Sequence, residues 1–313
     1  MSQALRLHPE NPHYFEFRGR PTVLVTSGEH YGAVLNGDFD YRRYLDELAR
    51  LGFNQTRTFA GTYREVIGSF SIEHNTLAPR PEAYVAPWPR TPTPGAADGL
   101  GKFDLSQWNE AYFARLKDFV AEAGRRGIVV ELVLFCPFYG AELWDICPMN
   151  ARNNVNAIGA VSMDEPLTLG HADLLAVQDR LVRRLVRELQ PYDNLYYEIC
   201  NEPYIKSLHP KAGYAGDDWQ AHVARLIVEA EAGSPSPHLI AQNINNGSTR
   251  VERPDPNVSV LNFHYSSPPD SVALNWSLGR AVGFDETGFR GREDRPYRCD
   301  GWDFLIAGGA VYS

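Results

Sequence analysis

The sequence predicts a (β/α)₈ barrel, and three observations support this. Strand-like and helix-like segments alternate from about residue 22 onward, and eight segments are strand-like. Ile128–Phe135 is nearly all apolar, as expected for a parallel strand covered on both faces. A chain of 313 residues accommodates a barrel of about 250 residues together with a hairpin and enlarged loops. A doubly wound sheet is the alternative for such an alternation.

The individual elements are predicted from apolar spacing and from the residues that end each segment. Asn11–Arg20 is typical of a small hairpin, with Arg18-Gly19 at its turn, and we expect it to cover the barrel floor. The expected strands are Thr22–Thr26, Phe53–Phe59, Ile128–Phe135, Leu195–Cys200, His238–Gln242, Val258–Phe263, Ala281–Phe284 and Ala310–Tyr312. The amphipathic helices are Asp40–Leu51, Ser106–Arg126, Leu174–Leu189 and Trp219–Ala230, and Gly52, Gly127 and Pro191 end the first three.

Two connections are unusually long, Gly61–Leu105 and Cys136–His171, and each follows a strand. In a barrel such loops lie on the C-terminal face, where active sites are found. If they close one end of a substrate cleft, they favour short substrates or action at the end of a substrate. We expect one domain over residues 1–313 that ends at strand eight. A regular barrel adds a helix there, so either a natural C-terminal tail is missing or another element covers the strand.

Composition and charge exclude several classes of protein. Thirty basic residues stand against thirty-nine acidic ones, giving a net charge of −9, and no basic stripe is visible, so we expect no nucleic-acid partner. No run of 18 or more apolar residues indicates a membrane span. The N-terminus lacks the apolar core of a signal peptide, so we expect a cytoplasmic protein, although a leader already removed would leave no trace. No oligomeric state is predicted.

The sequence predicts neither a metal nor a cofactor, because the cysteines lack metal-site spacing and the common nucleotide-binding and hydrolase motifs are absent. Cys136, Cys147, Cys200 and Cys299 form no CxxC pair and no metal-site spacing, so buried free thiols are expected, with a Cys136–Cys147 bridge as the alternative. No His-x-His follows strand one, which argues against a metal-dependent amidohydrolase. There is no Walker loop, no GxGxxG and no GxSxG elbow.

The most specific local pattern is LYYEICNEPY at Leu195–Tyr204, where an apolar strand leads directly into Asn201, Glu202 and Pro203. Pro203 cannot continue the ladder, so Glu202 lies at the C-terminal tip of the strand. Barrel strands present catalytic groups at this tip. Residues of one parity share a face, so four side chains are expected to point together into the barrel: Tyr196, Glu198, Cys200 and Glu202.

This segment resembles the signature of cellulase-like retaining glycoside hydrolases, the (β/α)₈ clan that includes glycoside hydrolase family 5. The motif falls on the fourth predicted strand, as in the clan. The resemblance implies that Glu202 is the general acid/base and that Asn201 binds the sugar 2-hydroxyl. The matching residues are Leu195, Tyr196, Tyr197, Glu198, Asn201, Glu202 and Pro203.

The same resemblance requires a second glutamate at the tip of strand seven. Ala281–Phe289, AVGFDETGF, delivers Glu286 to the same end of the barrel, three βα units after Glu202. By resemblance Glu286 is the nucleophile. Two carboxyl groups about 5–5.5 Å apart perform retaining hydrolysis when one is protonated and the other is ionised.

Further positions match the clan unevenly. Arg57 ends strand two, where the clan commonly has an arginine bonded to the nucleophile, and such an arginine would hold Glu286 ionised. Glu198 lies deeper in its strand and is expected to pair with Arg57. His264 and Tyr265 end strand six; they are adjacent here, whereas family 5 enzymes often place them two residues apart. Phe135-Cys136-Pro137 stands where that family often has a histidine.

Other candidates for sugar binding are a histidine and several tryptophans. His30 follows strand one on the catalytic face and is suited either to a sugar hydroxyl or to a structural hydrogen bond. Trp88, Trp144, Trp276 and Trp302 are candidates for stacking on a pyranose or for plain packing. Trp144 and Trp302 are favoured for stacking because they follow strands three and seven.

The resulting hypothesis is a retaining glycosidase that cleaves a β-linked glycoside or oligosaccharide, with carbohydrate as its only predicted partner. The acidic, aromatic-rich composition, with 12% aromatic residues, is compatible with sugar binding. Two alternatives stay open. One is a barrel that binds carbohydrate without hydrolysing it, and the other is a transglycosylase that uses the same site with a sugar acceptor in place of water.

Overall fold

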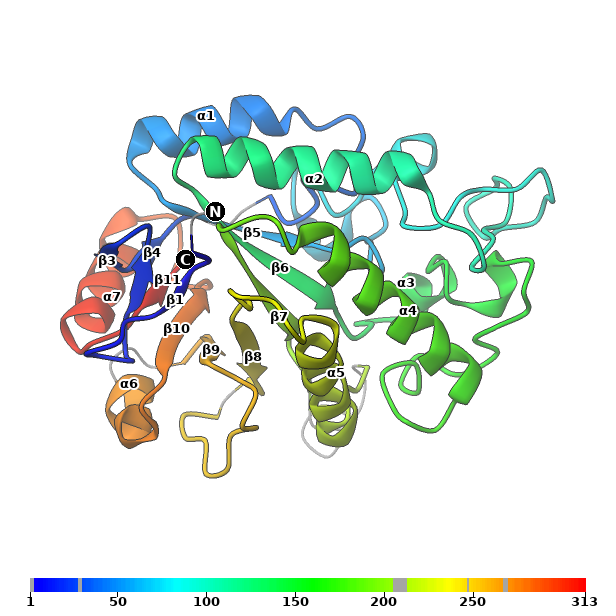
Figure 1. The fold of residues 1–313 in the computed structure, drawn as a ribbon. Coiled ribbons are helices and arrows are strands. Elements are labelled where there is room, and N and C mark those ends of the chain that lie inside the picture. Colours follow the sequence, from blue (N-terminus) through cyan, green and yellow to red (C-terminus); the bar gives the residue numbers. More distant parts are fainter. Residues whose placement is uncertain (1–2, 28–29, 205–212, 247, 267–269) are drawn as a thin grey trace.

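The structure, a computed structural model, describes residues 3–27, 30–204, 213–246, 248–266 and 270–313. Its centre is one eight-stranded parallel sheet in the order β4-β11-β10-β9-β8-β7-β6-β5, and the helices lie around it (Figure 1). The predicted (β/α)₈ barrel is therefore confirmed. The strands are β4 (Leu24–Val25), β5 (Gln55–Phe59), β6 (Val129–Phe135), β7 (Leu195–Cys200), β8 (Ile240–Ile244), β9 (Val260–His264), β10 (Ala281–Glu286) and β11 (Val311–Tyr312).

The sequence located all eight strands, with small errors at their ends. The largest error concerns β8, predicted at His238–Gln242 and observed two residues later at Ile240–Ile244. Its cause is His238, whose backbone N–H and ring are both bound by the Glu231 carboxylate, so that the chain is held out of the ladder.

The helices cover the sheet on its outer side. Three of the four predicted helices agree with the structure to within two residues, but the second begins at Glu110 rather than Ser106, with Asn109 as its N-cap. In the described residues no helix joins β8 to β9. The helices are α1 (Tyr41–Leu51), α2 (Glu110–Arg125), α3 (Ala141–Asp145), α4 (Ala172–Leu189), α5 (Asp217–Ala230), α6 (Asp270–Asn275) and α7 (Asp294–Ile306), with 3₁₀ turns η1 (Ser69–Ser71), η2 (Pro81–Ala83), η3 (Ala151–Asn153) and η4 (Trp276–Leu278).

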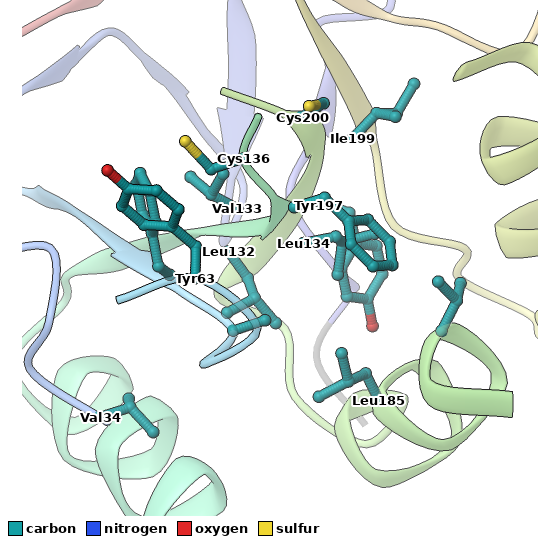
Figure 2. Packing of buried hydrophobic residues seen from close by; sticks show 14 of the residues in the cluster. Val34, Tyr63, Leu132, Val133, Leu134, Cys136, Leu185, Tyr197, Ile199 and Cys200 are labelled. Carbon is teal, nitrogen blue, oxygen red and sulfur yellow. The ribbon is translucent and has the colours of Figure 1, made fainter. Parts of the chain in front are cut away.

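The main hydrophobic core fills the layer between the strands and these helices. Figure 2 shows Leu185 of α4 beside Leu134 of β6 and Tyr197 of β7, all three fully buried. Alternate residues of each strand face this layer, and the others face the inside of the barrel. The interior-facing residues of the central strands include polar and charged groups, and these build the site described below.

The barrel is closed between β4 and β5 by a side chain in place of strand pairing. The Asn54 amide accepts from the N–H of Val25 at 2.8 Å and donates to the carbonyl of Val23 at 2.8 Å. The Asn54 backbone N–H adds a bond to the Val25 carbonyl at 3.2 Å. One asparagine thereby satisfies edge groups of a strand that is only two residues long.

The predicted N-terminal hairpin is present and has a third strand. β2 (Phe15–Phe17) pairs with β3 (Arg20–Thr22) across the Arg18-Gly19 turn, and β1 (Arg6–Leu7) pairs with β2. Both turn residues have positive φ, 50° and 76°, as a type I′ turn requires. The hairpin covers the floor, because Phe15 and Phe17 share an apolar cluster with residues near the N-terminal ends of barrel strands, such as Val129, Tyr196 and Val260.

The two long loops are ordered and hold each other in place on the C-terminal side of the strands. Phe103 exchanges backbone hydrogen bonds with the second loop, donating to Asn153 at 2.7 Å and accepting from Val155 at 2.9 Å. Arg64 adds a buried ion pair with Asp98 within the first loop and a bond to the carbonyl of Ile146 at 3.2 Å in the second.

Candidate active site

Three strands break the alternation of side chains where they reach the mouth of the barrel, the end at which parallel strands terminate. Adjacent residues of an extended strand point to opposite faces. Glu202, just beyond β7, has φ 38°, and Tyr265, just beyond β9, has φ 50°. The chain therefore turns, and Asn201 and Glu202 both reach the interior, as do His264 and Tyr265.

The end of β10 achieves the same result with a shift in register. Its pairing with β9 is irregular between Phe284 and Glu286. As a result the consecutive carboxylates of Asp285 and Glu286 both contact Arg57, at 3.3 Å from Nε and 3.2 Å from an Nη. Backbone strain of this kind is concentrated at functional sites in proteins. All three irregularities occur at strand ends that carry predicted site residues.

Glu202 is buried and accepts four hydrogen bonds. Tyr139 and Tyr204 donate their hydroxyls to Oε2 at 2.6 and 2.9 Å. Asn246 donates to Oε1 at 2.6 Å, and Nδ1 of His264 lies 3.1 Å from the same oxygen. Burial by itself would raise the pKa of Glu202, but the imidazolium of His264 and the surrounding donors outweigh it and lower the pKa to about 2.

Glu286 has a different environment. Arg57 and Tyr31 donate to its Oε2 at 3.2 and 3.3 Å, and the hydroxyl of Tyr265 donates to Oε1. Nδ1 of His264 lies 3.7 Å from Oε2. The Glu286 side chain is 19% exposed against 6% for Glu202, so the cationic guanidinium holds a carboxylate that is still open to solvent.

The two glutamates lie close together, with His264 between them. One carboxylate oxygen of each and a ring nitrogen of His264 all lie within 4.8 Å of one another. A carboxylate–imidazole set at this spacing has the ligand types that zinc uses. Here each carboxylate already has a cationic partner from the chain itself, His264 for Glu202 and Arg57 for Glu286.

His264 is buried and holds a proton in this arrangement. Burial by itself would lower the pKa of His264, but the negative charges of Glu286, Asp285 and Glu202 raise it well above its ordinary value. Nε2 of the ring lies 3.4 Å from Asp285, while Nδ1 faces Glu202. Asp285 therefore contacts both the arginine that binds Glu286 and the histidine that binds Glu202.

A second layer of buried polar residues lies beneath the glutamates. Arg57 forms the predicted ion pair with Glu198, both side chains being fully buried. Asn262 donates to Glu198 at 2.7 Å and to Glu131 at 2.6 Å. Burial and the neighbouring charges of Asp285 and Glu198 raise the pKa of Glu131 well above its usual range. The carboxyls of Glu131, Glu198 and Asp285 offer a second set of oxygens within 4.8 Å of one another, but it is occupied by Arg57 and amide donors.

The structure brings together most of the residues that the sequence singled out. Glu202, Glu286, Asn201, Arg57, His264 and Tyr265 form one connected network. Arg57 donates to Asn201 at 2.7 Å, and Asn201 donates to the hydroxyl of Tyr139 at 2.8 Å. Although His264 and Tyr265 are adjacent in sequence, they contact different glutamates: His264 contacts Glu202, and Tyr265 binds Glu286.

Three predicted sugar-binding residues are not brought to this network. Trp144 is 3% exposed, packs against Phe138 and donates its indole N–H to the carbonyl of Val161, so the expected stacking role is corrected to a packing role. Trp302 is 63% exposed on α7, an outer helix (Figure 1). His30 lies against the rings of Phe39 and Tyr44, at 4.8 and 4.9 Å between centroids, which is a structural setting.

The cysteines are free, and the alternative Cys136–Cys147 bridge is not formed. Three of them are buried as expected, whereas Cys299 on α7 is exposed. Cys136 has a place beside the site, because its thiol accepts from the Asn201 amide at 3.6 Å.

Sequence reasoning missed several residues of the network. Tyr31, Tyr139, Tyr204 and Asn246 contact the glutamates, and Asp285 contacts Arg57 and His264. A usable signal exists for the two tyrosines Tyr139 and Tyr204, for Tyr31 and for Asn246, because each follows the C-terminal end of a barrel strand by a few residues. Tyr139 in particular follows strand three, where the sequence lacks the histidine common in family 5. The contact of Asp285 depends on the irregular register of β10, which no residue pattern indicated.

Comparison with known proteins supports the fold. No protein-family model matches the chain, and no curated protein sequence matches it either. A solved glycoside hydrolase family 5 structure from Bacteroides vulgatus matches 99% of this chain and 62% of its own, with TM-score 0.58 and 12% identity. A β-mannanase from the blue mussel Mytilus edulis matches 100% of this chain and 91% of its own, with TM-score 0.61 and 10% identity.

A third neighbour is an exo-β-1,4-mannosidase from an Opitutaceae bacterium, with TM-score 0.57 and 17% identity over 96% of this chain and 53% of its own. The chain thus spans about half to two thirds of several proteins it resembles. At these identities the likeness shows a shared fold. The neighbours are (β/α)₈ glycoside hydrolases and mannanases, in agreement with the resemblance seen in the sequence. Among the described residues, no helix combines the length and apolar character that a membrane crossing requires.

Proposed function

We propose that this protein is a retaining glycoside hydrolase that cleaves a β-linked glycoside, with Glu286 as nucleophile and Glu202 as general acid/base. One observation carries the proposal. Two carboxylates at the C-terminal ends of barrel strands four and seven have oxygens within 4.8 Å of each other. Retaining enzymes separate these groups by about 5–5.5 Å, whereas inverting enzymes leave about 6.5–9.5 Å for a water molecule.

In the first step a Glu286 oxygen attacks the anomeric carbon and Glu202 gives a proton to the departing glycosidic oxygen. The C–O bond to the leaving sugar breaks, and a glycosyl ester forms on Glu286. Arg57, Tyr31 and Tyr265 hold the attacking carboxylate in position by their hydrogen bonds. In the second step Glu202 removes a proton from water, whose oxygen attacks the same carbon and releases Glu286.

The proton for the first step is held next to Glu202. In the free site it resides on His264, whose Nδ1 lies 3.1 Å from Glu202. Its transfer to Glu202 leaves a neutral imidazole and a neutral carboxylic acid, so no net charge is created in the buried site. A sugar that covers Glu202 favours this transfer, since desolvation disfavours the ion pair. The pair therefore acts as one acid with a shared proton.

A β-linked substrate is favoured by the resemblance to the clan and by the mannanases among the structural neighbours, which are named for β-linked substrates. The test is a screen of aryl β-glycosides, with the anomeric configuration of the first product followed by proton NMR. Release of the β-anomer first supports double displacement, and release of the α-anomer would point to inversion.

The Glu202→Gln variant separates the two glutamates. It should lose hydrolysis of glycosides with poor leaving groups far more than of those with activated aryl groups, because an activated group departs without a proton. Unchanged activity in this variant would overturn the assignment of Glu202. Binding of oligosaccharide without any turnover by the wild type would favour the non-hydrolytic barrel.

A further inference from the structure

Two phenylalanines stand exposed at the mouth of the barrel. Phe289, in the loop after β10, is 91% exposed, and Phe70, in the 3₁₀ turn η1 of the loop after β5, is 58% exposed. Large apolar side chains are normally buried, and a phenyl ring in water forgoes the stabilisation that its burial would give. Two exposed rings at the mouth are therefore candidates for contact with a ligand.

The backbone at both rings is also unfavourable. Phe70 has φ 56° and Phe289 has φ 60°, in the left-handed region that residues with a bulky side chain rarely adopt. Such a conformation costs on the order of 1–3 kcal/mol and clusters at ligand-binding sites. Neither strain nor exposure contributes to the stability of the barrel, so both observations point to binding.

Each ring contacts a tyrosine that binds one of the two glutamates. Phe70 lies 5.4 Å from the ring of Tyr139, whose hydroxyl is 2.6 Å from Glu202. Phe289 lies 5.2 Å from the ring of Tyr265, whose hydroxyl binds Glu286. Each phenylalanine thus extends the site outward from one catalytic carboxylate by one aromatic ring.

The two rings come from loops that follow strands on opposite sides of the barrel. Phe70 and Tyr139 follow β5 and β6, whereas Tyr265 and Phe289 follow β9 and β10. Around the closed sheet β9 is four strands from β5, and β10 is four strands from β6, which is the greatest separation that eight strands allow. In the series of contacts that connects the two rings, the glutamates and His264 stand in the middle.

We propose that Phe70 and Phe289 are two sugar-stacking platforms, one on each side of the scissile bond, so that the substrate is a β-linked chain cut at an internal linkage. This inference rests on the proposed function and specifies its substrate. The C–H groups of a pyranose face suit the electron-rich face of an aromatic ring. Platforms on both sides argue against the exo-action that the long loops had suggested, since a site for one terminal sugar needs only one.

The experiment compares a substrate that reaches both platforms with one that reaches neither. The long probes are β-1,4-linked hexasaccharides of glucose, mannose and xylose, and the short probe is the β-glycosyl fluoride of the sugar that is cleaved. Phe70→Ala and Phe289→Ala should each lower kcat/KM on the hexasaccharide roughly tenfold, the factor that corresponds to about 1.4 kcal/mol of lost contact. Fluoride release from the short probe should stay within twofold of wild type.

Three further variants serve as controls. Trp302→Ala removes an exposed aromatic ring from α7 and should leave both rates unchanged. Phe70→Tyr and Phe289→Tyr keep a stacking face and should retain wild-type kcat/KM on the hexasaccharide. Thermal denaturation of every variant checks the fold, and equal melting temperatures are expected because both phenylalanines are exposed.

The outcomes separate this inference from the proposed function. Cleavage of the hexasaccharide that is unaffected by both alanine variants, or release of only terminal sugars, would overturn the two platforms and leave the glycosidase standing. Activity on the fluoride with no binding or cleavage of any hexasaccharide would overturn them too. Calorimetric binding of a hexasaccharide that both variants weaken, without hydrolysis by wild type, would support the platforms and overturn the glycosidase.

Discussion

The floor and the mouth of the barrel are built in contrasting ways. At the floor, the hairpin places Phe15 and Phe17 on an apolar cluster with Tyr196 and Val129. At the mouth, one arginine and one histidine are surrounded by four carboxylates, those of Glu198, Glu202, Asp285 and Glu286. The floor is held together by burial of apolar surface, whereas the mouth buries charges that are expensive to desolvate.

The backbone shows the same contrast. Floor strands keep the regular alternation of side chains, and the positive φ angles of the hairpin turn fall where its type requires them. Positive φ angles at the mouth fall on Glu202, Tyr265 and Phe289, for which they are unfavourable. Stability is therefore expected to depend on the floor and activity on the mouth, and substitutions at the two ends should separate these properties.

The largest effect is expected for Glu286→Gln. Loss of the nucleophile should lower kcat by a factor on the order of 10⁴ or more, because the covalent intermediate no longer forms. Stability should hardly change, because glutamine keeps an oxygen that accepts from Arg57 and Tyr31. The substitution also removes one negative charge from a crowded set of carboxylates. Initial rates on an aryl β-glycoside and a urea unfolding curve measure the two properties.

The control for this variant is Glu293→Gln, which removes an exposed carboxylate beyond β10 and should leave both properties as in wild type. An unfolding free energy lowered by several kcal/mol in Glu286→Gln would show that the mouth stabilises the barrel. The contrast between the two ends would then be wrong.

The second effect tests the floor. Phe15 is fully buried and lies 6.4 Å from the ring of Tyr196. Phe15→Ala should lower the free energy of unfolding by about 3–5 kcal/mol through lost burial and a cavity. At a temperature where the variant is folded, kcat should remain within twofold of wild type. Unfolding by denaturant gives the first quantity, and steady-state kinetics gives the second.

Leu51→Ala provides the matched control, since that apolar side chain is 52% exposed at the end of α1 and its loss should cost well under 1 kcal/mol. A Phe15→Ala variant that is fully stable would show that the hairpin does not support the barrel. A folded variant with greatly reduced kcat would show that the floor and the mouth are coupled.

The fold was predictable from the sequence because each element carries a local signal that agrees with its neighbours. The apolar strand Val129–Phe135, the glycine caps and the Arg18-Gly19 turn each specify their own conformation. The closure at Asn54 was not predictable, since an asparagine that satisfies edge groups across a seam looks like any loop residue. The start of β8 was missed because the carboxylate of Glu231, seven residues earlier, fixes His238, a contact that no residue pattern indicated.

Site residues were predictable where a chemically reactive side chain lies at the C-terminal tip of a strand or on its inward face. Parity and the strand tip indicated Glu202 and Glu198, and the second tip indicated Glu286. The alternation of side chains gave a wrong expectation where the backbone departs from regular strand geometry. Regular alternation allows only one of Asp285 and Glu286 to face inward, whereas both do so in the structure. Trp144 was favoured for stacking because it follows strand three, yet it lies in the core, and the most exposed rings at the mouth belong to Phe70 and Phe289.

The third prediction concerns the charge that Asp285 places beside His264. Glu202, Glu286 and Asp285 surround this imidazole, with Arg57 next to it, and the three carboxylates raise the pKa of His264. A raised pKa keeps the proton in place until the pH rises through it. Asp285→Asn removes one negative charge, so the alkaline side of the kcat/KM profile should move to lower pH by about one unit.

The matched control for this shift is Glu131→Gln. Glu131 belongs to the same buried layer, but its carboxyl accepts from the amides of Gln55 and Asn262 and is not among the groups that raise the pKa of His264. Replacing this carboxyl by an amide should leave the alkaline side of the profile where it is in wild type. An equal shift in both variants would show that general disturbance of the layer, and not the charge of Asp285, sets the pKa of His264.

The smallest effect is expected at the turn of the floor hairpin. Gly19 has φ 76°, and a Cβ added there would meet no atom within 4 Å, so Gly19→Ala introduces backbone strain without a steric clash. The expected cost is about 1 kcal/mol of unfolding free energy. Gly19→Asn should cost less, because asparagine tolerates this region and suits the turn. Equal losses in the two variants would contradict the backbone explanation, and reduced kcat in either would mean that the turn influences the mouth through the length of the barrel.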